Sequence, residues 1–238
     1  MFNNEPKEIP VYVFMGFLGS GKTTFALNIA NNMTESYKRI LFVSLEMTTD
    51  QIVQCRVQMV GKVSSYDLKN TRVKSTAEKV ESAVNWMREH PIDFSRKSYV
   101  TVGYLEKIAL HKGYDCIIVD YLQLIRATSG KTQYEKISGI SNGLKQLALK
   151  LDTPVICLSQ LNRRSGETGE PEITDLRDSG SIEQDADAVL LLHLYDRSFD
   201  NSPSTLNVRI AKNRYGSSGT VSLDWYMRTR IMVDRKKR

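Results

Sequence analysis

The sequence has few cysteines and no long apolar segment. Its three cysteines are odd in number and show no CxxC spacing, and two of them, Cys116 and Cys157, lie inside apolar runs. We interpret them as small core residues of a protein in a reducing compartment. No apolar run approaches the roughly 20 residues that a membrane-spanning helix needs. The first ten residues carry two acidic side chains and no apolar stretch, unlike a secretory signal, so we expect a cytoplasmic or nucleoid-associated protein without membrane contact.

The sequence also lacks internal repeats, low-complexity tracts and an evident domain linker. Hydrophobic residues make up 41% and charged residues 25%, the proportions of a folded globular chain rather than a disordered one. A length of 238 residues suffices for one α/β domain and is short for two. The net charge of +6 permits a polyanionic partner without demanding one. Part of that charge lies at the C-terminus, where we expect residues 234–238 to form a disordered basic tail.

The segment GFLGSGKTT at residues 16–24 matches the phosphate-binding pattern GxxxxGK[ST] without a mismatch. Closely spaced glycines let backbone N–H groups surround a polyphosphate, and a following helix directs its positive end at that charge. An apolar run precedes the segment and a helical pattern follows it, which argues against a chance glycine-rich turn. The pattern predicts an ATP site in which Lys22 reaches the β- and γ-phosphates and Thr23 holds Mg²⁺. The predicted nucleotide-binding residues are Gly16, Gly19, Ser20, Gly21, Lys22, Thr23 and Thr24.

Apolar runs alternate with helical patterns along the first two thirds of the chain. The predicted strands are 11–15, 39–45, 98–103, 116–120 and 153–160, and the predicted helices are 23–33, 48–60, 76–90, 104–113 and 134–152. Residues 61–74 and 161–181 are polar, and we expect surface segments there. The last part contains three strand-like runs at 187–195, 204–213 and 220–225. This order predicts an α/β fold: a mostly parallel central sheet flanked by helices, with a C-terminal antiparallel hairpin.

Three polar residues stand where apolar strands end, at the edge of the sheet that faces the phosphate loop. Asp120 closes CIIVD, a Walker B pattern, and would hold Mg²⁺; a turn cap is the alternative. Glu46 closes the second strand and could take a proton from the attacking water, or be a surface glutamate. Gln160, after the strand that precedes the long polar segment, could hydrogen-bond the γ-phosphate, or be a polar strand end.

Five further strings give the sequence a specific resemblance. SLEM, VDYLQLI, LSQLNR, DLRDSGSIEQDAD and AKNRYG follow the phosphate loop in this order, and together they resemble the motor domain of DnaB-type replicative helicases over about residues 12–233. The resemblance implies a RecA-like P-loop ATPase in one domain, a homo-hexameric ring, and 5′-to-3′ movement on single-stranded DNA. It also implies that Glu46 is the catalytic base, Asp120 the Walker B acid and Gln160 the coupling residue.

The same resemblance assigns residues that would act across subunit and DNA interfaces. Arg214 would be an arginine finger placed in trans, with Lys212 beside it; the residues alone favour outward side chains of an edge strand, and the resemblance reverses that preference. An arginine suits a finger because its fixed positive fork stabilises charge on the γ-phosphoryl oxygens. The expected DNA-contacting residues, which could also be solvated loop residues, are Arg126, Lys131, Arg163, Arg164, Ser179, Gly180 and Ser181.

The chain departs from the family in two respects. Family members carry an N-terminal helical domain and a linker helix before the motor, whereas here the phosphate loop starts at residue 16, as expected for a minimal phage or plasmid helicase or an excised motor domain. Glu167, Glu170 and Glu172 stand where the family tends to have basic residues. A RecA-like module that binds or regulates a host helicase or loader without unwinding DNA is therefore an alternative, and a small-molecule kinase is a third.

Overall fold

The computed structural model describes residues 10–70, 72–95, 99–161, 170–173, 180–198 and 202–235. Its strands are β1 (Val11–Gly16), β2 (Ile40–Ser44), β3 (Ile92–Phe94), β4 (Cys116–Asp120), β5 (Val155–Gln160), β6 (Ala188–Asp196), β7 (Ser204–Asn213), β8 (Gly219–Tyr226) and β9 (Ile231–Asp234). Its helices are α1 (Lys22–Glu35), α2 (Thr49–Gly61), α3 (Ser65–Lys69), α4 (Lys74–Glu89), α5 (Val102–Lys112), α6 (Gln133–Leu151) and α7 (Gly180–Asp185), and a 3-10 helix, η1, spans Leu122–Leu124.

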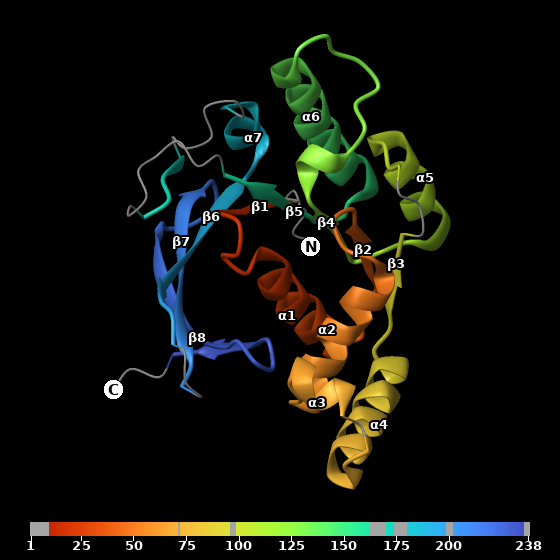
Figure 1. Cartoon of the computed structure of the whole chain (residues 1–238). Helices are drawn as coiled ribbons and strands as arrows, with labels where there is room; N and C mark the ends of the chain where they lie inside the picture. The colour runs from red at the N-terminus through yellow and green to blue at the C-terminus, as the bar shows by residue number, and fades with distance from the viewer. Residues whose placement is uncertain are drawn as a thin grey trace, which may run out of the picture.

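The strands of the described residues form one sheet in the order β3-β2-β4-β5-β1-β6-β7-β8-β9. The strands from β3 to β6 run parallel, and β6 to β9 pair antiparallel. Figure 1 shows the long β7 and β8 strands set apart from the parallel part, on the far side of β6. The predicted fold class is therefore confirmed.

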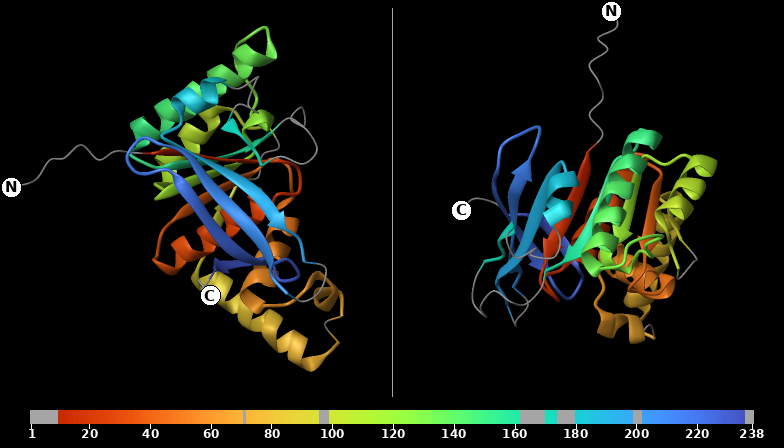
Figure 2. Two further views of the ribbon diagram at one scale, coloured as in Figure 1. Left: turned by 90° about the vertical axis from the view of Figure 1, so that its left-hand side faces the viewer. Right: turned by 90° about the horizontal axis from the view of Figure 1, so that it is seen from above.

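Helices cover both faces of the parallel strands, with α1 to α4 on one side and α5 to α7 on the other (Figure 1). Side chains of β1 alternate between these faces: Val13 and Met15 pack in the core beneath α5 and α6, and Phe14 packs in the core beneath α1 and α2. Strands buried on both faces carry continuous apolar runs, which explains why β2, β4 and β5 read so clearly in the sequence. The views in Figure 2 show the same layers from two further directions.

Several elements differ from the sequence-based predictions. Residues 65–69 form α3 instead of a purely irregular connection, because Ser64 caps the helix by accepting from the N–H of Asp67. The strand predicted at 98–103 is wrong over its described part: Val100 is a buried core residue of the lead-in to α5, and Thr101 caps that helix. The short β3, which pairs with β2, precedes this segment. Helix α7 and strand β9 were not predicted.

The C-terminal strand β9 extends the predicted hairpin into three antiparallel strands. It ends at Asp234, and Arg235 pairs with Asp224 and donates to Thr205, so both residues have defined positions. Residues 236–238 of the predicted tail lie outside the described residues. Within the described part of the chain, no helix has the length and apolarity to cross a membrane.

Candidate active site

Parallel pairing brings the predicted site residues to one edge of the sheet. Gly16 at the end of β1 pairs with Gln160 at the end of β5, and Ser44 at the end of β2 pairs with Asp120 at the end of β4. Glu46 follows Ser44 by two residues. Because the carboxyl ends of these strands coincide, four segments far apart in the chain converge where the phosphate loop leaves β1.

The phosphate loop between β1 and α1 has the backbone geometry that its glycines permit. Gly21 adopts φ 87°, a left-handed conformation that side chains disfavour, directly before the first turn of α1. A Cβ atom on Gly16 would lie 2.3 Å from the Ser20 Oγ atom and 2.9 Å from the Leu192 carbonyl oxygen, so this position favours glycine. Lys22 is folded onto the loop, where its Nζ atom donates to the carbonyl oxygens of Gly16 at 2.9 Å and Phe17 at 3.0 Å. The loop therefore holds its lysine among acceptors that a phosphate could replace.

Thr23 and Asp120 form the contact at the centre of this site. The Thr23 hydroxyl donates to the Asp120 carboxylate at 2.7 Å, and Asp120 is only 1% exposed. Burial raises the pKa of Asp120 to about 6, with Glu46 adding to the rise and the bond from Thr23 opposing it. Burial also lowers the pKa of Lys22, against the charges of Asp120 and Glu46. A buried carboxylate beside a threonine hydroxyl is an oxygen pair suited to a hard divalent cation.

Glu46 lies in the exposed turn between β2 and α2, facing the same site. Its charge acts on Asp120, Lys22 and Tyr121, in the direction that raises the pKa of each. The structure thus brings this predicted base near the phosphate loop, with its carboxylate open to solvent. A base that must reach a water molecule requires this openness.

Gln160 ends β5 beside the phosphate loop, and a second glutamine, Gln123, contacts the same strand end. Gln123 in η1 donates its amide N–H to the Ser159 hydroxyl at 2.9 Å and to the Gln160 carbonyl at 3.4 Å. Its Oε1 atom is buried without a hydrogen-bond partner among the described residues. Sequence reasoning assigned Gln123 no role, although its place three residues after Asp120 could have suggested one. It joins the segment after the Walker B strand to the strand end that carries Gln160.

Trp225 is the other neighbour of the phosphate loop that the sequence did not indicate. A Cβ atom on Gly21 would lie 2.8 Å from the Trp225 ring, which is 6% exposed and reaches the loop from β8. The turn before β9 is attached to α1 as well, because Asn28 donates to the Arg230 carbonyl and accepts from the Met232 N–H. The C-terminal strands therefore hold the loop and its helix from the side of the sheet opposite α6.

These residues fit a Mg²⁺–nucleoside triphosphate. Magnesium binds through one or two carboxylates or hydroxyls together with phosphate oxygens and water, and Thr23 with Asp120 supplies such a pair. In the described residues no group of three or more His, Cys, Asp and Glu side chains could hold a metal ion by itself, so a metal here would depend on the phosphates. The Ser20 hydroxyl is buried in the loop without a hydrogen-bond partner among those residues.

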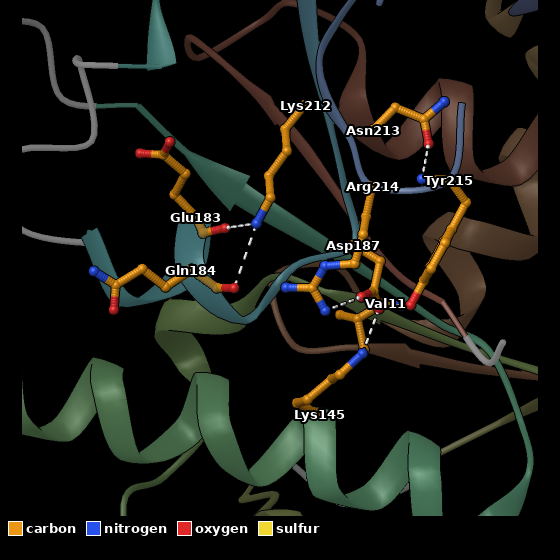
Figure 3. A network of polar contacts seen from close by, with 9 residues as sticks. All are labelled: Val11, Lys145, Glu183, Gln184, Asp187, Lys212, Asn213, Arg214 and Tyr215. Carbon is orange, nitrogen blue, oxygen red and sulfur yellow. Dashed lines mark hydrogen bonds and ion pairs between the residues drawn. The ribbon is translucent and has the colours of Figure 1, made fainter. Parts of the chain in front are cut away.

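Lys212 and Arg214 lie away from their own phosphate loop. The guanidinium of Arg214 donates to Asp187 at 3.0 Å, and Asp187 also accepts from the N–H of Val11, at the opposite end of β1 from Gly16. Five residue steps of a strand span about 16 Å, so Arg214 cannot reach the phosphate loop of its own chain. Lys212 donates to the carbonyl oxygens of Glu183 and Gln184 in α7 (Figure 3).

The predicted DNA-contacting residues are partly described. Arg126 and Lys131 are exposed in the segment between η1 and α6. Ser181 in α7 packs against α6, accepting from the hydroxyls of Ser138 at 2.9 Å and Ser141 at 3.5 Å. Gly180 is exposed at the start of α7, whereas Arg163, Arg164 and Ser179 lie outside the described residues.

The raised pKa of Asp120 predicts that Asp120→Asn stabilises the nucleotide-free protein. The ordinary pKa of 3.8 rises to about 6 on folding, so the free energy of unfolding decreases as the pH rises through this interval. Above this pH interval, the variant should unfold at a temperature roughly 5 °C higher, because its free energy of unfolding should be higher by on the order of 2 kcal/mol. Thermal melts with EDTA at about pH 7.5 and pH 4.5 test this, and the difference should shrink at the lower pH.

Asp115→Asn is the matched control for that experiment. Asp115 directly precedes β4, the strand that Asp120 ends, but hydrogen bonds from the Arg39 backbone and Lys38 lower its pKa. Its replacement should therefore bring no stabilisation at the higher pH. An Asp120→Asn variant that melts at or below the parent temperature near pH 7.5 would refute the burial argument.

Comparison with known proteins extends these observations. The family described as "DnaB-like helicase C terminal domain" matches residues 10–233. The "Probable plasmid replicative DNA helicase" of Chlamydia psittaci is 35% identical over 213 residues, which cover 85% of this chain and 46% of the relative. The "Replicative DNA helicase DnaB" of Geobacillus stearothermophilus is 33% identical over 233 residues, covering 92% of this chain and 51% of the relative. The chain spans about half the length of these curated relatives.

Two solved structures share the fold closely. One is described by its title as an ATPase domain; it superposes with a TM-score of 0.88 at 30% identity, over 95% of this chain and 85% of the other. The other is titled "The Structure Of A DnaB-Like Replicative Helicase And Its Interactions With Primase". Its TM-score is also 0.88, at 29% identity, over 95% of this chain and 57% of the other.

Proposed function

Because the chain belongs to the DnaB-like helicase C-terminal domain family, we propose that it is the ATP-hydrolysing motor of a replicative DNA helicase. Its subunits would hydrolyse ATP at their interfaces and move along single-stranded DNA. The observation that carries the proposal is the Thr23–Asp120 hydrogen bond, which joins the phosphate loop to the Walker B strand in one buried site. This pair, with Lys22 and Glu46 around it, is a hydrolytic site rather than a phosphate-binding loop alone.

Nucleotide binding would begin with the exchange of partners by Lys22. Its ammonium group leaves the carbonyl oxygens of Gly16 and Phe17 for the β- and γ-phosphates, while the N–H groups of the loop and the start of α1 face the same oxygens. Thr23 and Asp120 would hold Mg²⁺. The chemistry that a bound ion would supply there is positive charge against the negative charge that develops on the phosphate oxygens.

Hydrolysis would use the two polar strand ends beside the loop. The exposed carboxylate of Glu46 takes a proton from the attacking water, and the Gln160 amide hydrogen-bonds the γ-phosphate or that water. Gln123 ties the Gln160 strand end to η1, so a shift of Gln160 on loss of the γ-phosphate would reach the segment that contains Arg126. This connection provides a route from the nucleotide to a predicted DNA-contacting loop.

The remaining catalytic charge would come from the next subunit of a homo-hexameric ring. Arg214 is half exposed at the opposite end of β1 from its own phosphate loop, so a neighbouring molecule is where its guanidinium could meet a γ-phosphate. Lys212 would act beside it after release from the α7 carbonyl oxygens. Assembly of this kind makes hydrolysis depend on contact between subunits.

DNA would contact the side of the molecule where α6 and α7 pack together. Arg126 and Lys131 precede α6, and the backbone at Gly180 and Ser181 starts α7, so both predicted DNA segments lie near the same helix pair. Their contacts would be to phosphates, independent of base sequence and weakened by salt. By the family resemblance, movement would run 5′ to 3′, and a host helicase or loader is a candidate partner. The protein would then work in the cytoplasm, at the replicating DNA.

The test of this function is the rate of ATP hydrolysis per subunit, measured against protein concentration with and without single-stranded DNA. A site that is completed between subunits predicts a rate that rises with concentration, and a coupled motor predicts a further rise with DNA. Unwinding of a forked duplex is measured in parallel. Increasing salt should remove the DNA stimulation before it removes hydrolysis.

A rate that is independent of both concentration and DNA would contradict the motor and favour the alternative. In that case the chain would be a nucleotide-dependent module that binds or regulates a partner ring. Binding to a purified host helicase, without unwinding by the chain itself, would then be the distinguishing measurement.

A further inference from the structure

Asp187 is a buried carboxylate between α7 and β6 that neither the motif assignments nor the proposed mechanism uses. It is 1% exposed, and three elements direct polar groups at it: the start of β1, the middle of α6 and the end of β7. Figure 3 shows Lys145 reaching it from α6 and Arg214 reaching it from the residue after β7. A buried charge requires partners of this kind.

The contacts divide into two groups. The Oδ2 atom of Asp187 accepts from the N–H of Val11 at 2.8 Å and from the Lys145 ammonium at 2.5 Å. The Oδ1 atom accepts from the Arg214 guanidinium at 3.0 Å, and the Asp187 carbonyl oxygen accepts from the N–H of Arg214 at 2.8 Å. Asp187 therefore binds Arg214 at both its backbone and its side chain.

Exposure distinguishes the two cations. The Lys145 side chain is 15% exposed and lies inside the fold, where it neutralises the carboxylate. The Arg214 side chain is 46% exposed, so its end of the ion pair is open to solvent and to a neighbouring molecule. Lys145 and Val11 bind the Oδ2 atom alone, so Asp187 uses one oxygen for contacts inside the fold and turns the other, Oδ1, to the exposed arginine.

We propose that Asp187 is a positioning residue for the trans-acting Arg214. It fixes one edge of the guanidinium and leaves the other N–H groups exposed toward a neighbouring subunit. Holding the side chain in place before assembly lowers the entropy lost when the arginine meets the γ-phosphate. The inference rests on the proposed function, because it assumes that Arg214 acts on the next subunit's nucleotide.

The proposal predicts that Asp187→Asn lowers ATP turnover by about 10- to 100-fold, the loss expected for one charge-assisted hydrogen bond, with nucleotide affinity nearly unchanged. Turnover and fluorescent nucleotide binding are measured on each variant. Asp187→Glu keeps the charge but displaces it by one methylene, and it should give a smaller loss of turnover. It serves as the test if the asparagine variant does not fold. Asp115→Asn is the control, since Asp115 also accepts from a lysine and a backbone N–H and should leave turnover unchanged.

Mixing experiments separate a misplaced finger from a damaged site. A Lys22→Ala subunit cannot use its own nucleotide but still presents Arg214, so it should restore turnover when mixed with Arg214→Ala. An Asp187 variant should be restored in the same way, because its own phosphate loop is intact. Asp187→Asn added to Arg214→Ala should cause no further loss of turnover, since both changes act through one side chain.

The outcomes are separable. If the Asp187 variants keep parental turnover, or if they lose it and mixing restores only Arg214→Ala, the positioning role is refuted while the trans finger stands. If mixing fails to restore turnover to Arg214→Ala itself, the trans-acting arginine of the proposed function is refuted, and the positioning role of Asp187 is refuted as well. Restoration of all the variants supports the inference.

Discussion

Replacement of Arg214 by alanine should lower ATP turnover by about 10³-fold or more and leave nucleotide binding largely intact. The guanidinium would stabilise negative charge that develops on the γ-phosphoryl oxygens only during transfer, so its loss affects the rate far more than binding. In the free chain Arg214 is held by Asp187 and lies at the opposite end of β1 from its own phosphate loop. The fold should survive, because Lys145 and the Val11 N–H still bind the Asp187 carboxylate.

Steady-state hydrolysis and equilibrium binding of a fluorescent nucleotide measure the two quantities. Arg209→Ala is the matched control, because Arg209 is an exposed arginine of β7, the strand that Arg214 follows, and the proposed mechanism gives it no role. The finger assignment would be wrong if Arg214→Ala hydrolyses ATP at the rate of Arg209→Ala.

Replacement of Lys22 by alanine should weaken ATP binding by about 10- to 100-fold and reduce turnover by a larger factor. The phosphate loop holds this ammonium group among its carbonyl oxygens, so it is placed to meet the β- and γ-phosphates. Burial lowers its pKa, but the neighbouring charges of Asp120 and Glu46 oppose that shift. A bound phosphate that replaces these carbonyl acceptors would favour the charged form of Lys22 further.

Calorimetric titration of ATP with Mg²⁺ gives the affinity, and Lys38→Ala is the control. Lys38 is an exposed lysine that pairs with Asp115 at the amino end of β4, away from the phosphate loop. Equal ATP affinity in the two variants would show that Lys22 does not contact the phosphates. The contrast with Arg214→Ala is informative, since Lys22→Ala should weaken ATP binding and Arg214→Ala should lower only the rate of hydrolysis.

Much of the fold was predictable because strands β1, β2, β4 and β5 are buried on both faces and carry continuous apolar runs. Short or capped elements were not predictable in this way. Strand β3 has three residues, and α3 depends on a hydrogen bond between Ser64 and Asp67. The segment at residues 98–103 resembled a strand because apolar and polar residues alternate in it, yet Val100 lies in the lead-in to α5 and Val102 begins that helix.

The sequence by itself determined the residues that the structure brings together at the phosphate loop. Lys22 and Thr23 belong to a local motif, and Asp120 and Gln160 stand at the ends of apolar strands whose parallel order makes their carboxyl ends meet. Only the tertiary structure decided the partners. Sheet pairing and packing bring together residues that are far apart in the chain: Gln123 with Ser159, Trp225 with Gly21, and Asp187 with Arg214. The spacing of these residues along the chain does not predict that they meet.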